Sequence, residues 1–376
     1  MNILVMANFK AECSGNFINS LLALGEKAHS LGWQMTYMFP LRDDGTQCPW
    51  TDYMRDRGFE VITYSETMTQ KETEDFLVSV VEKYGIDLIH SHFSCLATIL
   101  LWNKTLHDNV RILFHDHMDF VPDQPVFGQI RKQLKTAKRY REYGIGVISV
   151  MKKKHRGYFC VPNRWYIPNG ITYQRNVKRS LTREEKRAQL GIGPEDRLCL
   201  FLGWDIYRKG VDIAIKAALK AREQGAPLIM GIVGFGADPK EEYLSRIRAV
   251  LGFDPMAEGI RFLESEEDMY ALHRAADVYL SASRTEVFSY GILEAISENV
   301  PVVASDISGT RWCLKYSKSI KFPSGNIEKC ADALIKAGSL RDLPSNRDLL
   351  TDRYSIDVWT QRVTEVYKEM AAEKRD

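Results

Sequence analysis

The sequence predicts an α/β protein built from two doubly wound domains, each a parallel sheet with helices on both faces. In both halves of the chain, short apolar stretches of strand type alternate with longer stretches of helical apolar spacing. Strands that alternate with helices form parallel sheets. The chain has 376 residues and is 45% hydrophobic. That length suits two domains, each with its own core.

The N-terminal half shows the alternation from its first residues. Asn2–Ala7 is a short apolar run typical of a buried strand, and Asn16–Leu31 carries apolar residues at helical spacing. Polar residues and turn formers in Leu41–Gly58 predict a long loop. The other expected elements of this half are the strands Gln34–Phe39, Phe59–Tyr64, Asp87–His92, Arg111–Phe114 and Gly146–Val150, and the helices Glu72–Tyr84 and Gln129–Tyr143.

The alternation stops around Asn169–Arg197, where turn residues precede the highly charged stretch Lys178–Arg187, and then resumes. We therefore expect an N-terminal domain at 1–175, a C-terminal domain at 176–355 and a last helix at about 356–376. The expected elements of the second domain are the strands Leu198–Leu202, Pro227–Val233, Ile260–Leu263, Asp277–Ser281 and Pro301–Ala304, and the helices Val211–Glu223, Glu241–Leu251, Asp268–Ala275 and Ser289–Ser297.

Cysteine spacing and hydropathy indicate the cellular compartment in which the protein is expected. The seven cysteines include no CxxC pair, which argues against a disulfide framework and a zinc site. No stretch approaches the roughly 18 consecutive apolar residues of a membrane-spanning helix. The apolar run at the N-terminus is too short for a signal-peptide core and lacks a basic leader. We expect a protein of the reducing cytoplasm.

The net charge of +2 conceals an uneven distribution along the chain. Residues 1–110 carry −6, residues 111–177 carry +9, and the remainder carries −1. The cations gather in 130–156, where a basic helix with an apolar stripe could lie on an anionic membrane surface at the inner face of the membrane. The alternative is a solvated face whose stripe packs on the domain core. Nucleic-acid binding is not expected, because no RNA- or DNA-binding motif accompanies the charge.

The segment 277–306 is the most informative for chemistry. It has Glu286 in a loop after a strand and Glu294 on the helix that follows. The helix begins with Ser289, Tyr290 and Gly291. A helix N-terminus carries about half a positive charge and favours phosphate. The carboxylates, at most about 12 Å apart along a helix, could bind hydroxyls at opposite ends of a sugar nucleotide. The alternative is an ordinary surface helix with two acidic residues.

Within this segment, residues 286–294 read EVFSYGILE. They resemble the E-x7-E signature of the GT4 family of retaining glycosyltransferases. The flanking AADV, SASRT and PVVASD match that family, as do FLG followed by RKG at 208–210, and GIVGFG at 231–236. The resemblance is strong at 165–310 and weaker at 1–165, where it runs through the Ser14-Gly15 loop, DLIHSH and HDH. It implies a GT-B fold of two Rossmann-like domains that face a cleft. The acceptor would bind mainly to the first domain and the nucleotide sugar to the second, and the last helix would cross back to the first.

The resemblance also implies roles for particular residues. Lys209, with Arg208 beside it, would hold the leaving diphosphate, while Glu294 would bind the ribose and Glu286 the donor sugar. Gly15 would allow close approach of the backbone to the ligand. One histidine of His115 and His117 would contact the donor sugar, and family geometry favours His117. The expected catalytic residues are Glu286, His117 and Lys209, and the expected donor-binding residues are Gly15, Arg208, Lys209, Gly234, Glu286, Phe288, Ser289, Tyr290, Gly291 and Glu294.

Two departures from the family pattern affect the phosphate site and the first loop. Trp204 stands where many relatives have an arginine, so either Arg208 substitutes for it or the diphosphate is held by one cation fewer. Ser14-Gly15 stands where many have paired glycines. The sequence has no Asp-x-Asp motif that would hold a divalent cation under a sugar nucleotide. We expect neither a metal nor another cofactor, because the cations and the helix terminus can serve instead.

The function that follows is that of a retaining hexosyltransferase of class EC 2.4. It would move a sugar from a nucleotide diphosphate, UDP or GDP, to a saccharide or lipid-linked acceptor in cell-surface polysaccharide or glycoconjugate synthesis. The alternatives are a non-catalytic GT-B partner of another transferase and a sugar-nucleotide epimerase. A nicotinamide-dependent oxidoreductase is disfavoured, because the segment from Gly234 to Lys240 lacks the third glycine of the dinucleotide fingerprint.

Overall fold

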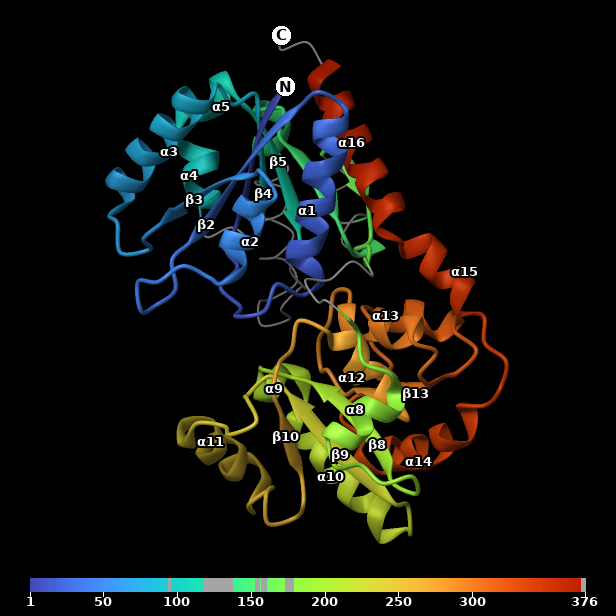
Figure 1. The fold of residues 1–376 in the computed structure, drawn as a ribbon. Helices are drawn as coiled ribbons and strands as arrows, with labels where there is room; N and C mark the ends of the chain where they lie inside the picture. Colours follow the sequence, from blue (N-terminus) through green and yellow to red (C-terminus); the bar gives the residue numbers. More distant parts are fainter. Residues whose placement is uncertain (94–95, 118–137, 153–155, 157–160, 173–178, 373–376) are drawn as a thin grey trace. The chain divides into compact units, whose positions relative to one another are not determined.

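The computed structural model describes residues 1–93, 96–117, 138–152, 156, 161–172 and 179–372. The chain forms two compact units, as the ribbon shows (Figure 1). Unit 1 comprises Met1–Thr172 and Ile356–Asp376, and unit 2 comprises Tyr173–Ser355. Each unit contains one parallel sheet, so the prediction of two Rossmann-like α/β domains is confirmed.

Unit 1 is built on a sheet of seven parallel strands in the order β3-β2-β1-β4-β5-β6-β7. Strand order reverses between β1 and β4, which is where doubly wound sheets bind ligands at their carboxyl ends. The strands are β1 Asn2–Ala7, β2 Gln34–Pro40, β3 Glu60–Tyr64, β4 Leu88–His92, β5 Arg111–Asp116, β6 Gly146–Ser149 and β7 Arg164–Tyr166. The helices include α1 Gly15–Ser30, α2 Trp50–Asp56, α3 Gln70–Tyr84, α4 Ala97–Trp102, α5 Lys104–Asn109 and α16 Ile356–Ala372.

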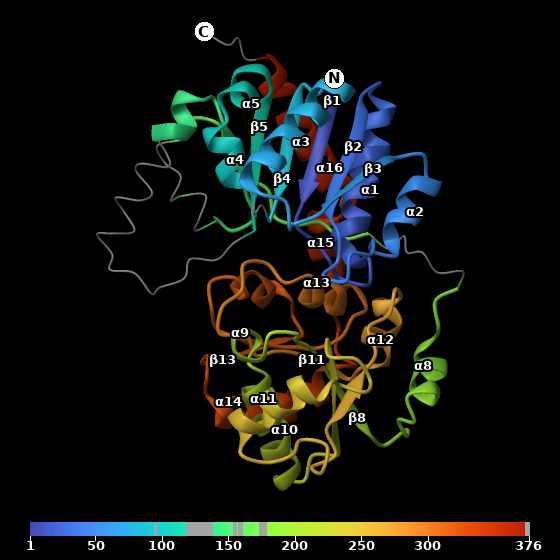
Figure 2. The ribbon, with the colours of Figure 1, turned by 90° about the vertical axis from the view of Figure 1, so that its left-hand side faces the viewer.

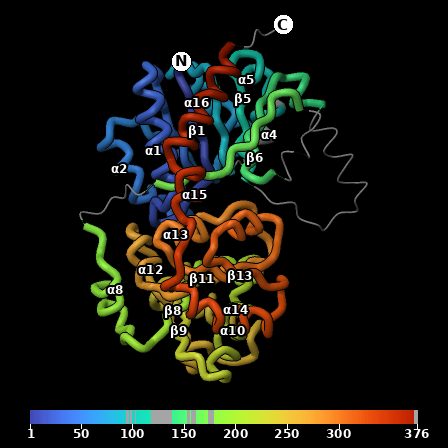
Figure 3. Tube along the Cα trace, turned by 90° about the vertical axis from the view of Figure 1, so that its right-hand side faces the viewer, coloured from blue at the N-terminus to red at the C-terminus, as the bar shows by residue number. Residues whose placement is uncertain are grey.

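The two faces of this sheet differ in what covers them. Side chains of α3, α4 and α5 pack with Leu4, Ile89 and Phe114 in one apolar core, and Figure 2 views the sheet from the α3 side. The opposite face carries His90 and is covered by α1 and α16, which pack against each other. Figure 3 shows α16 running beside α1. The alternation of side chains along a strand therefore separates an apolar face from a face rich in histidine.

Several elements of unit 1 differ from the sequence prediction. The expected loop Leu41–Gly58 contains α2, which buries Trp50 and Met54. The strand β7 and the helices α4 and α5 were also not predicted. All four are seven residues or shorter, too short for apolar periodicity to show. Of the expected helix Gln129–Tyr143 only residues 138–143 lie in the described part of the chain.

Unit 2 is built on six parallel strands in the order β10-β9-β8-β11-β12-β13. The strands are β8 Arg197–Leu202, β9 Leu228–Val233, β10 Arg261–Leu263, β11 Val278–Ser281, β12 Val302–Ser305 and β13 Ser319–Phe322. The helices are α8 Arg183–Gln189, α9 Ile206–Lys209, α10 Val211–Glu223, α11 Glu241–Leu251, α12 Met269–Ala275, α13 Tyr290–Ser297, α14 Ile327–Ala337 and α15 Arg347–Thr351. The elements β13, α9, α14 and α15 were not predicted.

Part of the charged stretch at which the alternation of strands and helices was expected to stop forms the helix α8. Thr182 and Glu185 form a capping box at its start. Arg183 and Arg187 then bind the two carboxylate oxygens of Asp277 at 2.6 and 2.9 Å. Two cations of α8 therefore pair with the residue that precedes β11, and a third, Lys186, pairs with Glu266.

No helix in the described residues is long and apolar enough to cross a membrane. Of the basic segment 130–156, predicted as a membrane-surface helix, residues 130–137 and 153–155 lie outside the described residues. Its membrane contact stays a prediction.

Candidate functional site

Lys209 and Glu286 form an ion pair in unit 2. Lys209 ends the short helix α9, and Glu286 lies in the loop between β11 and α13. The Lys209 Nζ donates to Glu286 Oε2 at 2.5 Å, and the two side chains are 16% and 9% exposed. Gly210 follows with φ +73°, and a Cβ there would meet the Ala282 carbonyl oxygen at 2.3 Å. Only glycine fits at this position, so the Lys-Gly pair at 209–210 has a steric reason.

The Glu286 carboxyl is ionised in this setting. Burial favours its neutral form, but the Lys209 ammonium and, more weakly, the Arg208 guanidinium outweigh burial and hold the pKa of Glu286 below its usual value. Gly309 packs so closely on the Glu286 backbone that a Cβ would overlap the Glu286 carbonyl oxygen. The close contact with Gly309 restricts the loop that carries the Glu286 carboxylate.

Arg208 is held in position by two neighbours in the loop after β8. Its guanidinium lies over the Trp204 ring at 4.9 Å from the centroid, and its backbone N–H donates to Asp205 Oδ1 at 2.9 Å. The Trp204 side chain is 64% exposed. Trp204 therefore supports Arg208 through a cation–π contact.

Arg284, which follows β11, holds the segment that contains Tyr207, Arg208 and Asp212, and sequence analysis gave it no role. Its guanidinium forms a bidentate pair with Asp212 at 2.8 and 2.6 Å, and it donates to the Tyr207 carbonyl at 2.7 Å. Its own N–H donates to the Arg208 carbonyl at 2.8 Å. The pair spans 72 residues of sequence, so no local pattern could have indicated it.

The helix α13 begins at Tyr290, and Ser289 is its N-cap. The Ser289 hydroxyl accepts from the Ile292 N–H at 3.3 Å and so occupies one of the amides of the first turn. A Cβ on Gly291 would meet Tyr279 Oη at 2.3 Å, so glycine lets the helix rest on β11. The Phe288 ring stacks on Trp312 with centroids 4.5 Å apart. Because this ring is buried in the domain, a ligand contact at Phe288 would come from its backbone.

Glu294 lies one helical turn further and has a partner that sequence analysis missed. His273 Nε2 lies 3.2 Å from Glu294 Oε2, and the His273 side chain is fully buried. His273 Nδ1 has no hydrogen-bond partner among the described residues. The geometry makes Nε2–H the donor, which orients the Glu294 carboxylate.

Gly234 brings two loops of unit 2 together. It has φ +126°, and a Cβ there would lie 3.0 Å from Gly203 C and Trp204 N. The backbone after β9 therefore packs directly on the backbone after β8. Both loops lie at the carboxyl ends of neighbouring strands, the edge at which doubly wound sheets bind ligands.

The residues predicted for unit 1 lie at the carboxyl edge of its sheet and at the start of α1. Gly15 begins α1 with φ +54°, and a Cβ there would meet nothing within 4 Å. His117 follows β5 and is partly exposed, whereas His115 is buried at 3% exposure. Of these two histidines, His117 is the one that a ligand could reach.

Three buried histidines of unit 1 could hold a metal ion by proximity. His90, His92 and His115 each offer a ring nitrogen, and these nitrogens lie within 4.8 Å of one another. However, the His90 and His115 planes are within 14° of parallel, and His90 Nδ1 and Nε2 already face Tyr367 Oη and His115 Nδ1 at 2.7 and 3.2 Å. Stacked, hydrogen-bonded rings do not point their lone pairs at one central ion.

Comparison with known proteins gives a family match in the C-terminal part of the chain. Residues 182–349 match the model of the family "Glycosyl transferases group 1". This match includes Lys209, Glu286, His273 and Glu294. The prediction of a group 1 glycosyltransferase is supported at this level, and the narrower GT4 assignment stays a prediction.

Curated relatives cover different shares of the chain. An uncharacterized glycosyltransferase, MJ1607, from Methanocaldococcus jannaschii is 28% identical over 36% of this chain and 35% of its own length. The match spans about a third of the length of the first such relatives. A phosphatidyl-myo-inositol mannosyltransferase of Mycobacterium leprae is 25% identical over 94% of this chain and 90% of its own. The Escherichia coli lipopolysaccharide glucosyltransferase WaaG is 30% identical over 42% and 41%.

Solved structures resemble the chain over almost its entire length. A glycosyltransferase from Rickettsia africae superposes with a TM-score of 0.74 at 15% identity and covers 99% of each chain. Anabaena Alr3699/HepE in complex with UDP-glucose gives 0.74 at 16% identity and covers 98% of this chain and 100% of its own. At these identities the likeness establishes the shared fold.

Proposed function

We propose that the protein is a retaining glycosyltransferase of the GT4 type that transfers a sugar from a nucleotide diphosphate to a saccharide or lipid-linked acceptor. The observation that carries the proposal is the Lys209–Glu286 pair at 2.5 Å, buried within the region that matches group 1 glycosyltransferases. A cation for a diphosphate and a carboxylate for sugar hydroxyls are thereby in contact before any ligand arrives.

The donor would bind along the loops of unit 2. Glu294, oriented by His273, would accept hydrogen bonds from the ribose, and the N-terminus of α13 would receive the diphosphate. The ionised Glu286 would accept hydrogen bonds from the donor sugar. Backbone groups near Gly234 would border the base.

Catalysis in this account is stabilisation of the leaving diphosphate. Breaking the anomeric C–O bond places growing negative charge on the phosphate oxygen, and Lys209 and Arg208 are fixed cations beside it. In the free protein, Lys209 is already paired with Glu286. Donor binding would bring a diphosphate to the Lys209 ammonium and sugar hydroxyls to the Glu286 carboxylate. Each of the two charges would then still have a partner. The positive groups make a metal ion unnecessary.

Retention of anomeric configuration rests on the resemblance to GT4 enzymes. The acceptor hydroxyl would attack from the face that the diphosphate leaves, and the leaving phosphate would take the proton. His117 would be the residue of unit 1 that contacts the donor sugar, and its partial exposure supports this choice over His115. Gly15, with open space where a Cβ would stand, would admit the ligand at the start of α1.

The donor base and the acceptor are proposed from the named relatives. The HepE structures hold UDP and UDP-glucose, which favours a UDP-linked donor over a GDP-linked one. Relatives named for mannosyl transfer to phosphatidyl-myo-inositol and glucosyl transfer in lipopolysaccharide favour a lipid-linked or saccharide acceptor of the cell surface. A protein at the inner face of the membrane would suit such acceptors.

A thermal-shift screen tests donor binding directly. The purified chain is heated with UDP, GDP, ADP and their sugars, and a ligand at a hundred times its dissociation constant should add about 2.7 kcal/mol to the free energy of unfolding. We expect the UDP series to raise the melting temperature most. No shift with any nucleotide would contradict the proposed donor site.

A further inference from the structure

Aromatic rings of unit 1 pack against the partly exposed His117 ring. Phe93 and His115 stack on it, each with centroids 4.4 Å away and planes within 28° and 18° of parallel. His92 lies 5.2 Å away at 29°, and Phe17 of α1 meets the ring edge-on at 6.0 Å. A side chain with this many ring contacts has little rotational freedom.

Phe93 makes its contact from a strained backbone. Its φ is +50°, in the left-handed region that bulky residues rarely adopt. Such a conformation costs on the order of 1–3 kcal/mol and persists where the surroundings over-determine it. Here the strained residue directly follows β4 and stacks on His117. The strained residue therefore lies in direct contact with the histidine that is predicted to contact the sugar.

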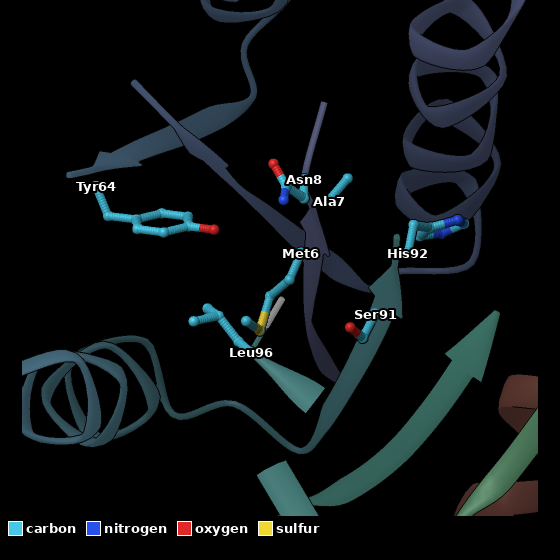
Figure 4. Close-up of a pocket in the computed structure, with 7 residues that line it drawn as sticks. All are labelled: Met6, Ala7, Asn8, Tyr64, Ser91, His92 and Leu96. Carbon is cyan, nitrogen blue, oxygen red and sulfur yellow. The ribbon is translucent and has the colours of Figure 1, made fainter. Parts of the chain in front are cut away.

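A hydrogen bond joins His117 to the end of β4. His92 Nδ1 lies 3.0 Å from His117 Nε2. Figure 4 shows the His92 ring directed towards a neighbouring helix; His92 lines a small cavity of about 10 Å³ together with residues that include Met6 and Ser91. The His92 side chain is fully buried, and its other nitrogen, Nε2, has no hydrogen-bond partner among the residues that the structure describes.

Burial decides which nitrogen of His92 carries the proton. Burial, with neighbouring histidines, lowers the pKa of His92 well below its usual value, so the ring is neutral and bears one proton. A buried N–H without an acceptor is rarer in proteins than a buried acceptor without a donor. The proton therefore lies on Nδ1, which donates to His117 Nε2.

We propose that His92 is a positioning residue that fixes His117 in the tautomer protonated at Nδ1. The Nε2 lone pair of His117 is then occupied by the His92 N–H and cannot take a proton from an acceptor hydroxyl. An effect of this tautomer on sugar transfer rests on the proposed function, whereas the tautomer itself does not.

Nuclear magnetic resonance of the full chain with ¹⁵N-labelled histidine reads the tautomer without any substrate. A His117→Gln variant assigns the His117 ring signals by their loss. We expect the neutral Nδ1–H form in the unsubstituted protein and in His92→Asn, whose amide N–H can replace Nδ1–H. In His92→Leu the Nε2–H form should appear. An Nε2–H tautomer in the unsubstituted protein would overturn the proposal, even if His92→Leu failed to fold.

Sugar transfer supplies the second readout. His92→Leu should lower kcat by about tenfold or more, as expected for a lost positioning hydrogen bond, with little change in the donor KM. His92→Asn should restore kcat to within about threefold. Equal losses in both folded variants would contradict a positioning role. If no donor is turned over by the unsubstituted protein, the proposed function fails and the tautomer result still stands.

Discussion

Lys209 has two partners in this account, Glu286 in the free protein and the diphosphate in the complex. Its side chain is 16% exposed, and its Nζ lies 2.5 Å from the Glu286 carboxylate. A residue that compensates a buried charge and also binds a leaving group should affect both stability and turnover when it is replaced. The loss of turnover should be much larger than the loss of stability, so the two effects can be distinguished by their size.

Lys209→Ala should lower turnover by at least about 100-fold, the cost of one preorganised group on a developing charge. The free energy of unfolding should fall by only about 1–3 kcal/mol, because the unpaired Glu286 can take a proton. Lys209→Arg, which keeps the charge, is the control and should retain more activity. Steady-state kinetics and urea unfolding measure the two effects. Unchanged turnover in Lys209→Ala would refute its role.

Glu294 and His273 should act together on nucleotide affinity. Glu294→Ala should weaken UDP binding by about 10- to 100-fold, since hydrogen bonds to a charged group are worth about 1.5–3 kcal/mol. His273→Leu should weaken it by a smaller factor, because the carboxylate remains and loses only its orientation. Calorimetry with UDP measures both. Glu298→Ala, which breaks a pair with Arg274 at the far end of α13, is the control and should leave affinity unchanged.

At the scale of elements, α13 approaches the sheet closely at Gly291. A Cβ at Gly291 would lie 2.3 Å from Tyr279 Oη and 2.7 Å from Leu202 Cδ1. Gly291→Ala should therefore push the helix off the sheet, lower the free energy of unfolding by about 1–3 kcal/mol and weaken UDP binding. Gly193→Ala is the control, because its Cβ would meet only the side chain of Asp196. Equal stability in the two variants would show that α13 does not need this close contact.

The elements also show what sequence patterns can predict. Long periodic helices such as α10 and α11 have the predicted bounds, Val211–Glu223 and Glu241–Leu251, because several turns of apolar spacing define them. The helix α8 was not predicted in the charged stretch Lys178–Arg187, although the Thr182 and Glu185 capping box was a local signal for it. The pairs of His273 with Glu294 and of Arg284 with Asp212 join separate elements. Residue spacing along the chain does not encode such contacts. His273 and Arg284, which hold the predicted site residues in place, could therefore be found only from the structure.

At the scale of the whole molecule, the buried histidines make stability depend on pH. Burial lowers the pKa of His90 to about 3 and places those of His92 and His115 well below the usual value of 6.5. In the unfolded chain these rings titrate near 6.5. Their contribution to folding is therefore fully present above pH 6.5 and is lost as the pH falls towards 3. The sign follows because the unfolded state binds more protons over this range.

The free energy of unfolding should fall below pH 6.5 by up to about 1.4 kcal/mol per pH unit for each of these histidines. Urea unfolding between pH 8 and 5 measures the slope. His115→Leu should reduce the slope by one proton equivalent relative to the unsubstituted protein. A stability that stays flat from pH 8 to 5 would mean that these rings are solvated.

The central claim is that the chain transfers sugars from a nucleotide diphosphate by means of Lys209 and Glu286. The most direct test measures release of nucleotide from a panel of UDP-, GDP- and ADP-sugars, with an acceptor mixture, by the unsubstituted protein and by Lys209→Ala. The account predicts release of UDP from at least one UDP-sugar and its loss in the Lys209→Ala variant. Absence of binding and turnover with every donor, or equal release by both proteins, would contradict it.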